Sequence, residues 1–508
     1  MSAKASAVGA AGKSIAPHYL TIFTFFWACQ ALVHQEYYWR GWLTDNLMGW
    51  VLTGFILATL AFPRSLALFS AMLISSIVFN VDIGPHAINH ILLESIIDFI
   101  ILLAIGYTLW QQKTDPVSDR EMRTRIFETF APVLILIVIL MYWFIANSKL
   151  NFDFFSFDRS CIADFYIDVL DFLPFLGLPE LNVALNTTPA KISLWIFMLV
   201  EVLIPLFLMF RKTRYIALII GVPFHMLLAM VGHRTFTGFI FALYTLICAD
   251  SLAVLFGDWR SRFEANKEQS IRRLKIAATA IVGVAIAGCI YAYIGHGGFH
   301  GVFKYFRYWL FVFFFGAVGI TILLAISRNY KVGDSEPTEI WTWAPKWVWL
   351  MMVPVIINGA APFIGLKTES SFAMYSNLRT EGDINNHMFM PVWRVAGYQD
   401  DLVNILDSNH PQLKEWIEVI PLHDREMILR KVNVVYFEFN RIISESMVEN
   451  TDMDFYVTYT RNGGEEQTFR SADPNASEVD VAQLQSKVLR KLLFFRPVFV
   501  GQISYCQH

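Results

Sequence analysis

The sequence predicts a polytopic all-α transmembrane bundle of about 9–11 helices, followed by a small extracytoplasmic α+β domain. Of 508 residues, 55% are hydrophobic and 16% are charged, whereas an ordinary globular chain is about 25% charged. The mean hydropathy of +0.46 leaves too few polar residues to cover a water-facing surface. The formal net charge of −3 gives no basic excess, so no nucleic-acid partner is expected.

Long apolar runs supply the predicted helices, because a hydrocarbon core of about 30 Å requires about 20 apolar residues. The expected regions are a cytoplasmic N-terminal tail over 1–18, a transmembrane domain over 19–364 and a soluble domain over 365–508. Eleven runs fit the helix template, and they are 19–35, 47–62, 66–82, 90–110, 130–147, 192–210, 214–231, 236–256, 276–294, 305–326 and 346–364.

The orientation follows from the loops that carry Lys and Arg. Basic residues occupy alternate loops, near positions 64, 113–125, 211–214, 260–275 and 328–331. Because cytoplasmic loops retain positive charge, the N-terminus is predicted to be cytoplasmic. The region after residue 365 is then extracytoplasmic or lumenal.

From Gly365 onward the composition becomes that of a water-soluble domain. A helical pattern covers Asp400–Ile420, and strand-like alternation covers Lys431–Asn440 and Asp454–Thr460. The sequence Asn462–Gly464 is typical of a turn. These elements predict a small mixed domain.

Two further expectations depend on this orientation. Cys161 and Cys506 both lie on the predicted oxidising side, so they are the one pair expected to form a disulfide. Asn475–Ser477 is a glycosylation acceptor only if the tail is lumenal in a eukaryotic cell.

Ionisable residues inside apolar runs are functional candidates, because each costs several kcal/mol unless it is paired or hydrated. His90 opens the fourth run, and Glu94 and Asp98 follow at i+4 and i+8 on the same helical face. This face either contributes to a site or forms a buried structural network. His34, at the outer end of the first run, either joins a site or anchors the helix end.

Lys149 lies just beyond the outer end of the fifth run, and Glu201 lies about halfway along the sixth. His225 follows Arg214 by eleven residues, which places it near the middle of the bilayer. A lysine at an apolar boundary loses hydration of its charged form, so its pKa falls and a neutral amine becomes available as a base. Such an amine suits proton abstraction from a lipid-soluble hydroquinone. The alternative for Lys149 is a helix-end anchor.

No metal site is expected. The histidines and carboxylates lack the HExxH motif or a comparable paired spacing, and five scattered cysteines do not form a thiolate site. A serine nucleophile elbow, a phosphate-binding glycine loop and a dinucleotide fingerprint are also missing from the sequence.

Three stretches together resemble the HTTM domain family, to which the vitamin K-dependent gamma-carboxylase belongs. The longest runs from Glu201 to His225 and includes Pro205 and Pro223. The others are Asn89–His90 and Ser148–Phe154, and their order and spacing are together more specific than any one motif. The resemblance covers roughly residues 15–365, with a weaker similarity at Lys367–Met374.

The resemblance implies that Lys149 is the base that deprotonates vitamin K hydroquinone. Oxygen then converts the hydroquinone to a strong base, which takes a γ proton from a peptide glutamate before carbon dioxide adds. His90 matches a histidine that binds the quinone or its oxyanion, and His225 matches a second motif histidine. Glu94, Glu201 and Arg214 are expected to orient these groups or to hold structure.

The implied cofactors are therefore a reduced vitamin K-type quinone, O2 and CO2, without a metal. The expected partners are the lipid bilayer and an extracytoplasmic peptide or protein substrate. The region after residue 365 departs from the family, because it does not resemble the longer lumenal region of the carboxylase. Its polar residues Asn377, Arg379 and His387 either line the outer mouth of the site or cap helices and turns.

A second function class stays open. The chain could be a non-catalytic membrane protein that binds a peptide or protein through its outer domain. A transporter is disfavoured, because the sequence has no inverted repeats or paired broken helices. Substitutions distinguish the first two classes. An enzyme should lose activity on Lys149→Ala, whereas a binding protein should lose partner binding on changes at Asn377, Arg379 or His387.

Overall fold

The computed structural model describes residues 17–37, 46–84, 89–156, 159–172, 188–295, 299–329, 345–417, 432–449, 454–473, 487–499, 504 and 506. Most of the predicted N-terminal tail and the acceptor Asn475–Ser477 lie outside these residues. The chain forms two compact units, which are described separately. The first comprises Met1–Phe79, Glu94–Ile139 and Leu203–Met351, and the second comprises Asn80–Leu93, Leu140–Val202 and Met352–His508.

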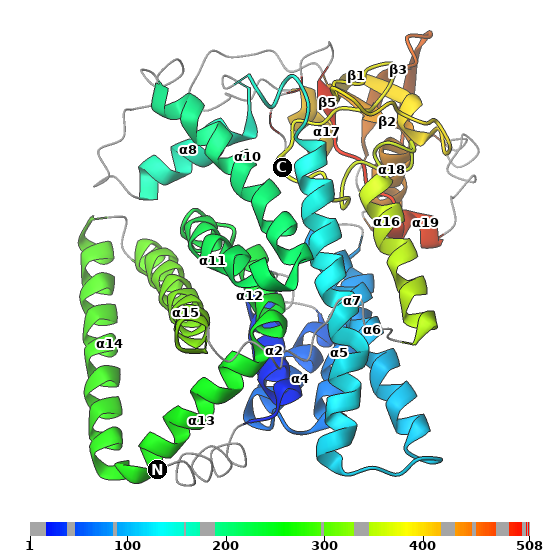
Figure 1. Ribbon diagram of the computed structural model, residues 1–508. Helices are drawn as coiled ribbons and strands as arrows, with labels where there is room; N and C mark the ends of the chain where they lie inside the picture. The colour runs from blue at the N-terminus through cyan, green and yellow to red at the C-terminus, as the bar shows by residue number, and fades with distance from the viewer. Residues whose placement is uncertain are drawn as a thin grey trace. The chain divides into compact units, whose positions relative to one another are not determined.

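Each of the eleven predicted apolar runs contains at least one helix (Figure 1). The helices are α2 Tyr19–Tyr37, α4 Leu47–Ala61, α5 Leu66–Ile83, α6 Asn89–Gln111, α7 Asp119–Ser148, α10 Thr188–Met209, α11 Arg214–Met230, α12 Arg234–Ile247, α13 Ala249–Ala265, α14 Lys267–Gly295, α15 Phe299–Asn329 and α16 Met352–Ala360. The structure adds α8, Cys161–Phe172, which was not predicted, and short 3-10 turns at Arg211–Thr213 and Lys346–Met351. The chain is thus mostly helical, as expected.

Five helices in the described part of the chain, namely α5, α6, α7, α10 and the α11 segment, are long and apolar enough to cross a membrane. The number rises to six if α12 and α13 together form one span. Length and composition therefore support a membrane protein.

Two predicted straight spans differ from the structure. The run 236–256 bends by 88° between α12 and α13, at Cys248. The chain therefore changes direction within this run instead of crossing as one straight helix. The run 346–364 begins as a 3-10 turn, and α16 covers only nine residues. Pro354 lacks an N–H and so fits the first turn of this short helix.

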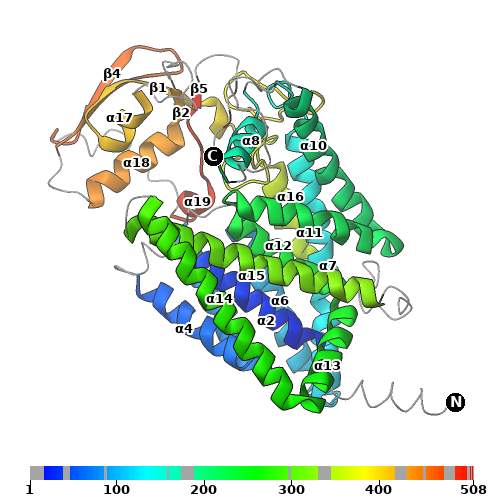
Figure 2. The same cartoon turned by 90° about the vertical axis from the view of Figure 1, so that its left-hand side faces the viewer.

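In the first unit, α2 packs against α4, α12 and α13, while α15 packs against α11, α12, α13 and α14. Figure 2 shows α14 and α15 running beside each other. Aromatic side chains fill the interior; Phe23 stacks on Trp27 and contacts Phe130. At Gly221 of α11, an added Cβ would overlap the side chain of Tyr244 on α12.

The second unit contains an antiparallel sheet in the order β4-β3-β1-β2-β5. The strands are β1 Leu402–Ser408, β2 Val432–Val435, β3 Tyr456–Arg461, β4 Glu466–Arg470 and β5 Val498–Phe499. Helices α17 (Pro411–Ile417) and α18 (Tyr436–Glu449) pack against the sheet (Figure 2). Their shared core includes Val403, Leu413 and Phe439. A further short helix, α19, covers Lys487–Leu492.

The local predictions for this region are partly right. The turn at Asn462–Gly464 is confirmed, since Asn462 and Gly463 have φ angles of 50° and 69° at the hairpin between β3 and β4. The predicted helix over Asp400–Ile420 is wrong in its first half, because β1 pairs with strands on both of its edges. The predicted strand over Lys431–Asn440 ends at Val435, where α18 begins.

The expected disulfide is present. Cys161 and Cys506 are bonded across 345 residues of sequence. The bond ties the start of α8 to the C-terminal end of the chain within the second unit.

We expect Gly221→Ala to destabilise the first unit, because the new methyl group would overlap the buried Tyr244 ring. Overpacking of this kind typically costs about 1–3 kcal/mol. Gly106→Ala on α6 is the matched control, since its added Cβ has no neighbour within 4 Å and alanine favours a helix. Thermal melting in detergent measures the effect. Equal melting temperatures for the two variants would contradict the close packing of α11 on α12.

Candidate functional site

The predicted base and one of its predicted supporting groups form a buried ion pair in the second unit. The Nζ of Lys149 donates to both carboxylate oxygens of Glu201, at 2.7 and 2.8 Å. The two residues are 2% and 5% exposed. Lys149 directly follows the last residue of α7, and Glu201 lies on α10. Phe197 precedes Glu201 by one turn, and its ring centroid lies 5.3 Å from Nζ.

The surroundings of Lys149 lower the proton affinity of its amine. Burial lowers the pKa of Lys149 below its usual value, while the charge and hydrogen bonds of Glu201 oppose that shift. In an apolar interior, a neutral amine beside a neutral acid avoids the cost of desolvating two charges. The bidentate contact therefore provides a short path along which the proton can move between the amine and the carboxylate.

Asn151 fixes the chain just after Lys149. Its side chain is fully buried, and its Nδ2 donates to the carbonyl oxygens of Ser148 and Ser376. Its Oδ1 accepts the backbone N–H of Phe154 at 2.8 Å. Asn151 lies within the Ser148–Phe154 motif, but no role for it was predicted. Its position two residues after Lys149 was the available signal.

His387 also packs against the end of α7. Its Nε2 lies 2.9 Å from the carbonyl oxygen of Asn147, and its Nδ1 accepts the backbone N–H groups of Phe389 and Met390 at 3.0 and 2.8 Å. This arrangement requires the neutral tautomer with a proton on Nε2. Burial lowers the pKa of His387, and the Asn147 carbonyl opposes the shift. Both ring nitrogens serve to hold the loop.

Asn377 connects three parts of the second unit. Its Oδ1 accepts the backbone N–H of Cys161 at 2.9 Å, and its Nδ2 donates to the carbonyl oxygens of Arg159 and Ser504 at 2.7 and 3.0 Å. These contacts fit the capping role that was one of the two expectations for this polar segment.

The backbone around Asn377 is strained. Ser370, Tyr375 and Asn377 have φ angles of 52°, 49° and 55°. Each such conformation costs about 1–3 kcal/mol and is found mainly where the surroundings impose it, often at functional sites. The segment is largely buried although it is irregular.

Arg379 belongs to a cluster of buried charges that sequence reasoning missed. Burial lowers the pKa of Arg379, Glu381 raises it, and Arg496 lowers it further. The Nε of Arg496 lies 3.6 Å from the Glu381 carboxylate. Burial also lowers the pKa of nearby Lys367 to about 8, against the attraction of Glu369. Charged residues in a polar stretch gave no contrast from which this cluster could be recognised.

In the first unit, the acidic face of α6 packs against α2. The Nδ1 of His34 lies 2.5 Å from Glu94, and Gln30 donates to the other oxygen of Glu94 at 2.6 Å. The indole N–H of Trp27 donates to Asp98 at 2.8 Å. These contacts form the buried structural network that was one expectation for this face. His34 is therefore part of that network and not only an end anchor.

The other predicted residues are buried but distributed between the units. His90 is 3% exposed in the first turn of α6, within the second unit. His225, in the first unit, is completely buried among the rings of Phe224, Phe236, Phe241 and Tyr244. Arg214, also in the first unit, donates to the carbonyl oxygen of Leu208 at 3.2 Å.

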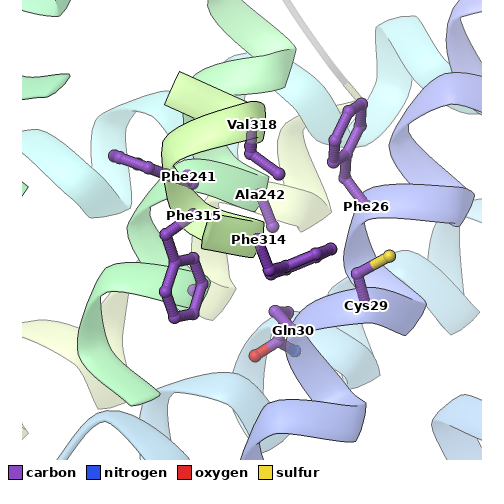
Figure 3. Close-up of a pocket in the computed structure, with 9 residues that line it drawn as sticks. Phe26, Cys29, Gln30, Phe241, Ala242, Phe314, Phe315 and Val318 are labelled. Atoms are coloured by element: carbon purple, nitrogen blue, oxygen red, sulfur yellow. The ribbon is translucent and has the colours of Figure 1, made fainter. Parts of the chain in front are cut away.

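A small pocket lies between α2, α12 and α15 of the first unit (Figure 3). Its lining is Phe26, Cys29, Gln30, Gly238, Phe241, Ala242, Phe314, Phe315 and Val318. Gln30, whose Nε2 donates to Glu94, is the one amide among them. The free space is that of about one water molecule, which is too small for a quinone ring.

The described residues contain no group of three or more His, Cys, Asp or Glu side chains placed to hold a metal ion.

We expect protonation of His387 to destabilise the second unit. Because its folded-state pKa lies below its usual value, the unfolded chain binds a proton more readily, and stability falls as the pH drops below about 6.5. His387→Asn retains an acceptor for the two backbone N–H groups and does not titrate. Thermal melting between pH 8 and pH 5 should show a smaller loss in the variant. An identical loss in both proteins would contradict the assigned hydrogen bonds.

Comparison with known proteins found no matching family model, no matching curated protein and no matching solved structure.

Proposed function

We propose that the protein is a multi-pass membrane enzyme of the vitamin K-dependent gamma-carboxylase type, with Lys149 as its base. Its substrate would be an extracytoplasmic peptide or protein. The enzyme would use a reduced quinone and O2 to deprotonate a glutamate of this substrate and would then add CO2 to it. The observation that carries the proposal is the buried, bidentate contact between Lys149 and Glu201. The membrane-length helices support a membrane location. The proposed orientation, with the N-terminus cytoplasmic and the C-terminal region outside, comes from the basic residues in alternate loops of the sequence.

The two side chains would perform a proton transfer. Glu201 accepts a proton from the Lys149 ammonium group and leaves a neutral amine. The amine then accepts the proton of a substrate hydroxyl, which leaves an oxyanion and regenerates the ammonium group beside the acid form of Glu201. Release of that acid proton restores the starting pair. Glu201 thus serves as the proton acceptor that makes the lysine a base near neutral pH.

The residues present fit a hydroquinone in their chemistry. A phenolic hydroxyl group matches an amine base of lowered pKa, and Phe197 offers an aromatic face beside Nζ. When bound, the reduced quinone and O2 would supply the strong base needed to remove a proton from carbon. The protein itself would hold the amine in place through Asn151 and exclude water by burying the pair.

Roles for the remaining residues follow from their positions. His90 would stabilise the oxyanion. This role requires that the start of α6 face the substrate. His225, Glu94 and Arg214 would maintain the helix bundle through the contacts described above. Asn377, Arg379 and His387 would hold the irregular segment that follows α16.

Lys149→Ala should abolish quinone-dependent oxygen uptake and epoxide formation by the protein in nanodiscs. Loss of a general base typically reduces the rate by about 10²–10⁴-fold. Lys191→Ala is the matched control, because it removes an exposed lysine from the same helix that carries Glu201. Reduced naphthoquinones should be supplied both with and without glutamate-containing peptides, since the carbon acid can be required for turnover.

Folding must be separated from catalysis in this experiment. Removing one member of a buried ion pair leaves an unpaired charge that costs about 3–5 kcal/mol. The double variant Lys149→Ala/Glu201→Gln removes that charge and should melt closer to the wild type while remaining inactive. Turnover in the double variant would refute the base role, and a wild type inactive with all these substrates would refute the proposed function.

A further inference from the structure

An uninterrupted apolar run, Met388-Phe389-Met390-Pro391-Val392-Trp393, lies largely on the surface of the second unit. Phe389 is 76% exposed and Trp393 is 56% exposed. Val395, just beyond the run, is 79% exposed. Scattered apolar residues are normal on a protein surface, but a contiguous exposed run marks a binding surface.

This run is held in place by defined contacts. The N–H of Met388 donates to the carbonyl oxygen of Leu150 at 2.9 Å, and that of Trp393 donates to Phe363 at 2.6 Å. Arg394 reaches back to the carbonyl oxygen of Thr380 at 2.9 Å and to Asp400 at 2.7 Å. The charged side chain is therefore tied to the protein, while its neighbours Trp393 and Val395 remain exposed.

The attachment points lie at the ends of two apolar helices. Leu150 follows the end of α7 by two residues, and Phe363 follows the end of α16 by three. Helix α16 itself exposes Val353, Ile356 and Ile357, at 50%, 45% and 46%. Phe152, whose N–H donates to Asn386, is 65% exposed.

Exposed apolar surface therefore occurs both along α16 and in the run attached to its end. In membrane proteins, tryptophan and other aromatic residues concentrate where an apolar helix reaches the headgroup region. A protein partner would be expected to meet a polar rim around an apolar centre. Here Arg394, the charged residue within 388–395, is bound to Thr380 and Asp400 of its own chain.

We infer that residues 388–395 insert into the boundary between lipid headgroups and acyl chains and anchor the second unit to the bilayer surface. Phe152, Phe389, Trp393 and Val395 are the inserted side chains. His387 immediately precedes the run and contacts the end of α7. The anchor thus holds the loop beside Lys149 at the level of the membrane surface. The inference requires a bilayer around α7 and α16, but not the proposed chemistry.

Spin-label accessibility in nanodiscs of phosphatidylcholine tests this inference on the full chain. Cys29, Cys248 and Cys289 are replaced by serine, the Cys161–Cys506 disulfide is kept, and a label is attached at Val395→Cys or Phe389→Cys. Both labels should collide more often with oxygen, which concentrates in lipid, than with a water-soluble nickel chelate. Gln467→Cys, on the exposed strand β4, is the matched control and should show the opposite preference.

Two outcomes overturn the inference. Preferential collision with the nickel chelate would place the run in water, and protection from both reagents would indicate coverage by protein. If the labelled variants do not fold, Trp393→Phe provides a milder test by fluorescence. Brominated lipid should quench a larger fraction of the emission in the wild type than in this variant, and equal fractions would also overturn the inference.

Discussion

The bidentate contact between Lys149 and Glu201 is the interaction on which the proposed site depends. It joins the end of α7 to α10, and both partners are withdrawn from water. A buried charge without a partner is too costly to retain, so each residue accounts for the presence of the other. Asn151 and His387 then fix the backbone beside Lys149.

Buried carboxylates in the first unit also need partners, but their partners are of a different kind. Glu94 and Asp98 are as deeply buried as Glu201, but their partners are His34, Gln30 and the indole of Trp27. These contacts join α2 to two successive turns of α6 and hold the two helices together. Proton exchange within the lysine pair would leave a primary amine, whereas exchange between His34 and Glu94 would leave an imidazole whose Nε2 lies 3.3 Å from the carbonyl oxygen of Thr235. That difference is why we assign chemistry to one cluster and structure to the other.

Much of the helical fold could be predicted from the sequence, because apolar runs of fixed length contrast strongly with their surroundings. Lys149, Glu201 and Glu94 stood out for the same reason. Their partners did not, since Glu201 lies 52 residues beyond Lys149 and no local pattern encodes that contact. Cys161 and Cys506 were an exception, because the predicted topology left one pair on the oxidising side.

The region after residue 365 was less predictable. Strand β1 was read as a helix, because its pairing with β2 and β3 decides its conformation and neither contact is local. Arg496 was missed, since a charged residue in a polar stretch gives no contrast. Asn377 was recognised as unusual, but its contacts with Cys161, Arg159 and Ser504 required the folded chain.

Chemical rescue of Lys149→Ala tests the central claim most directly. If Lys149 acts as a base, small primary amines added to the variant should restore quinone-dependent turnover, and the restored rate should rise with amine basicity among amines of equal size. Neutral alcohols of the same size should have no effect. Loss of turnover that no amine restores, in a variant that melts like the wild type, would contradict the claim that the Lys149 amine removes the proton.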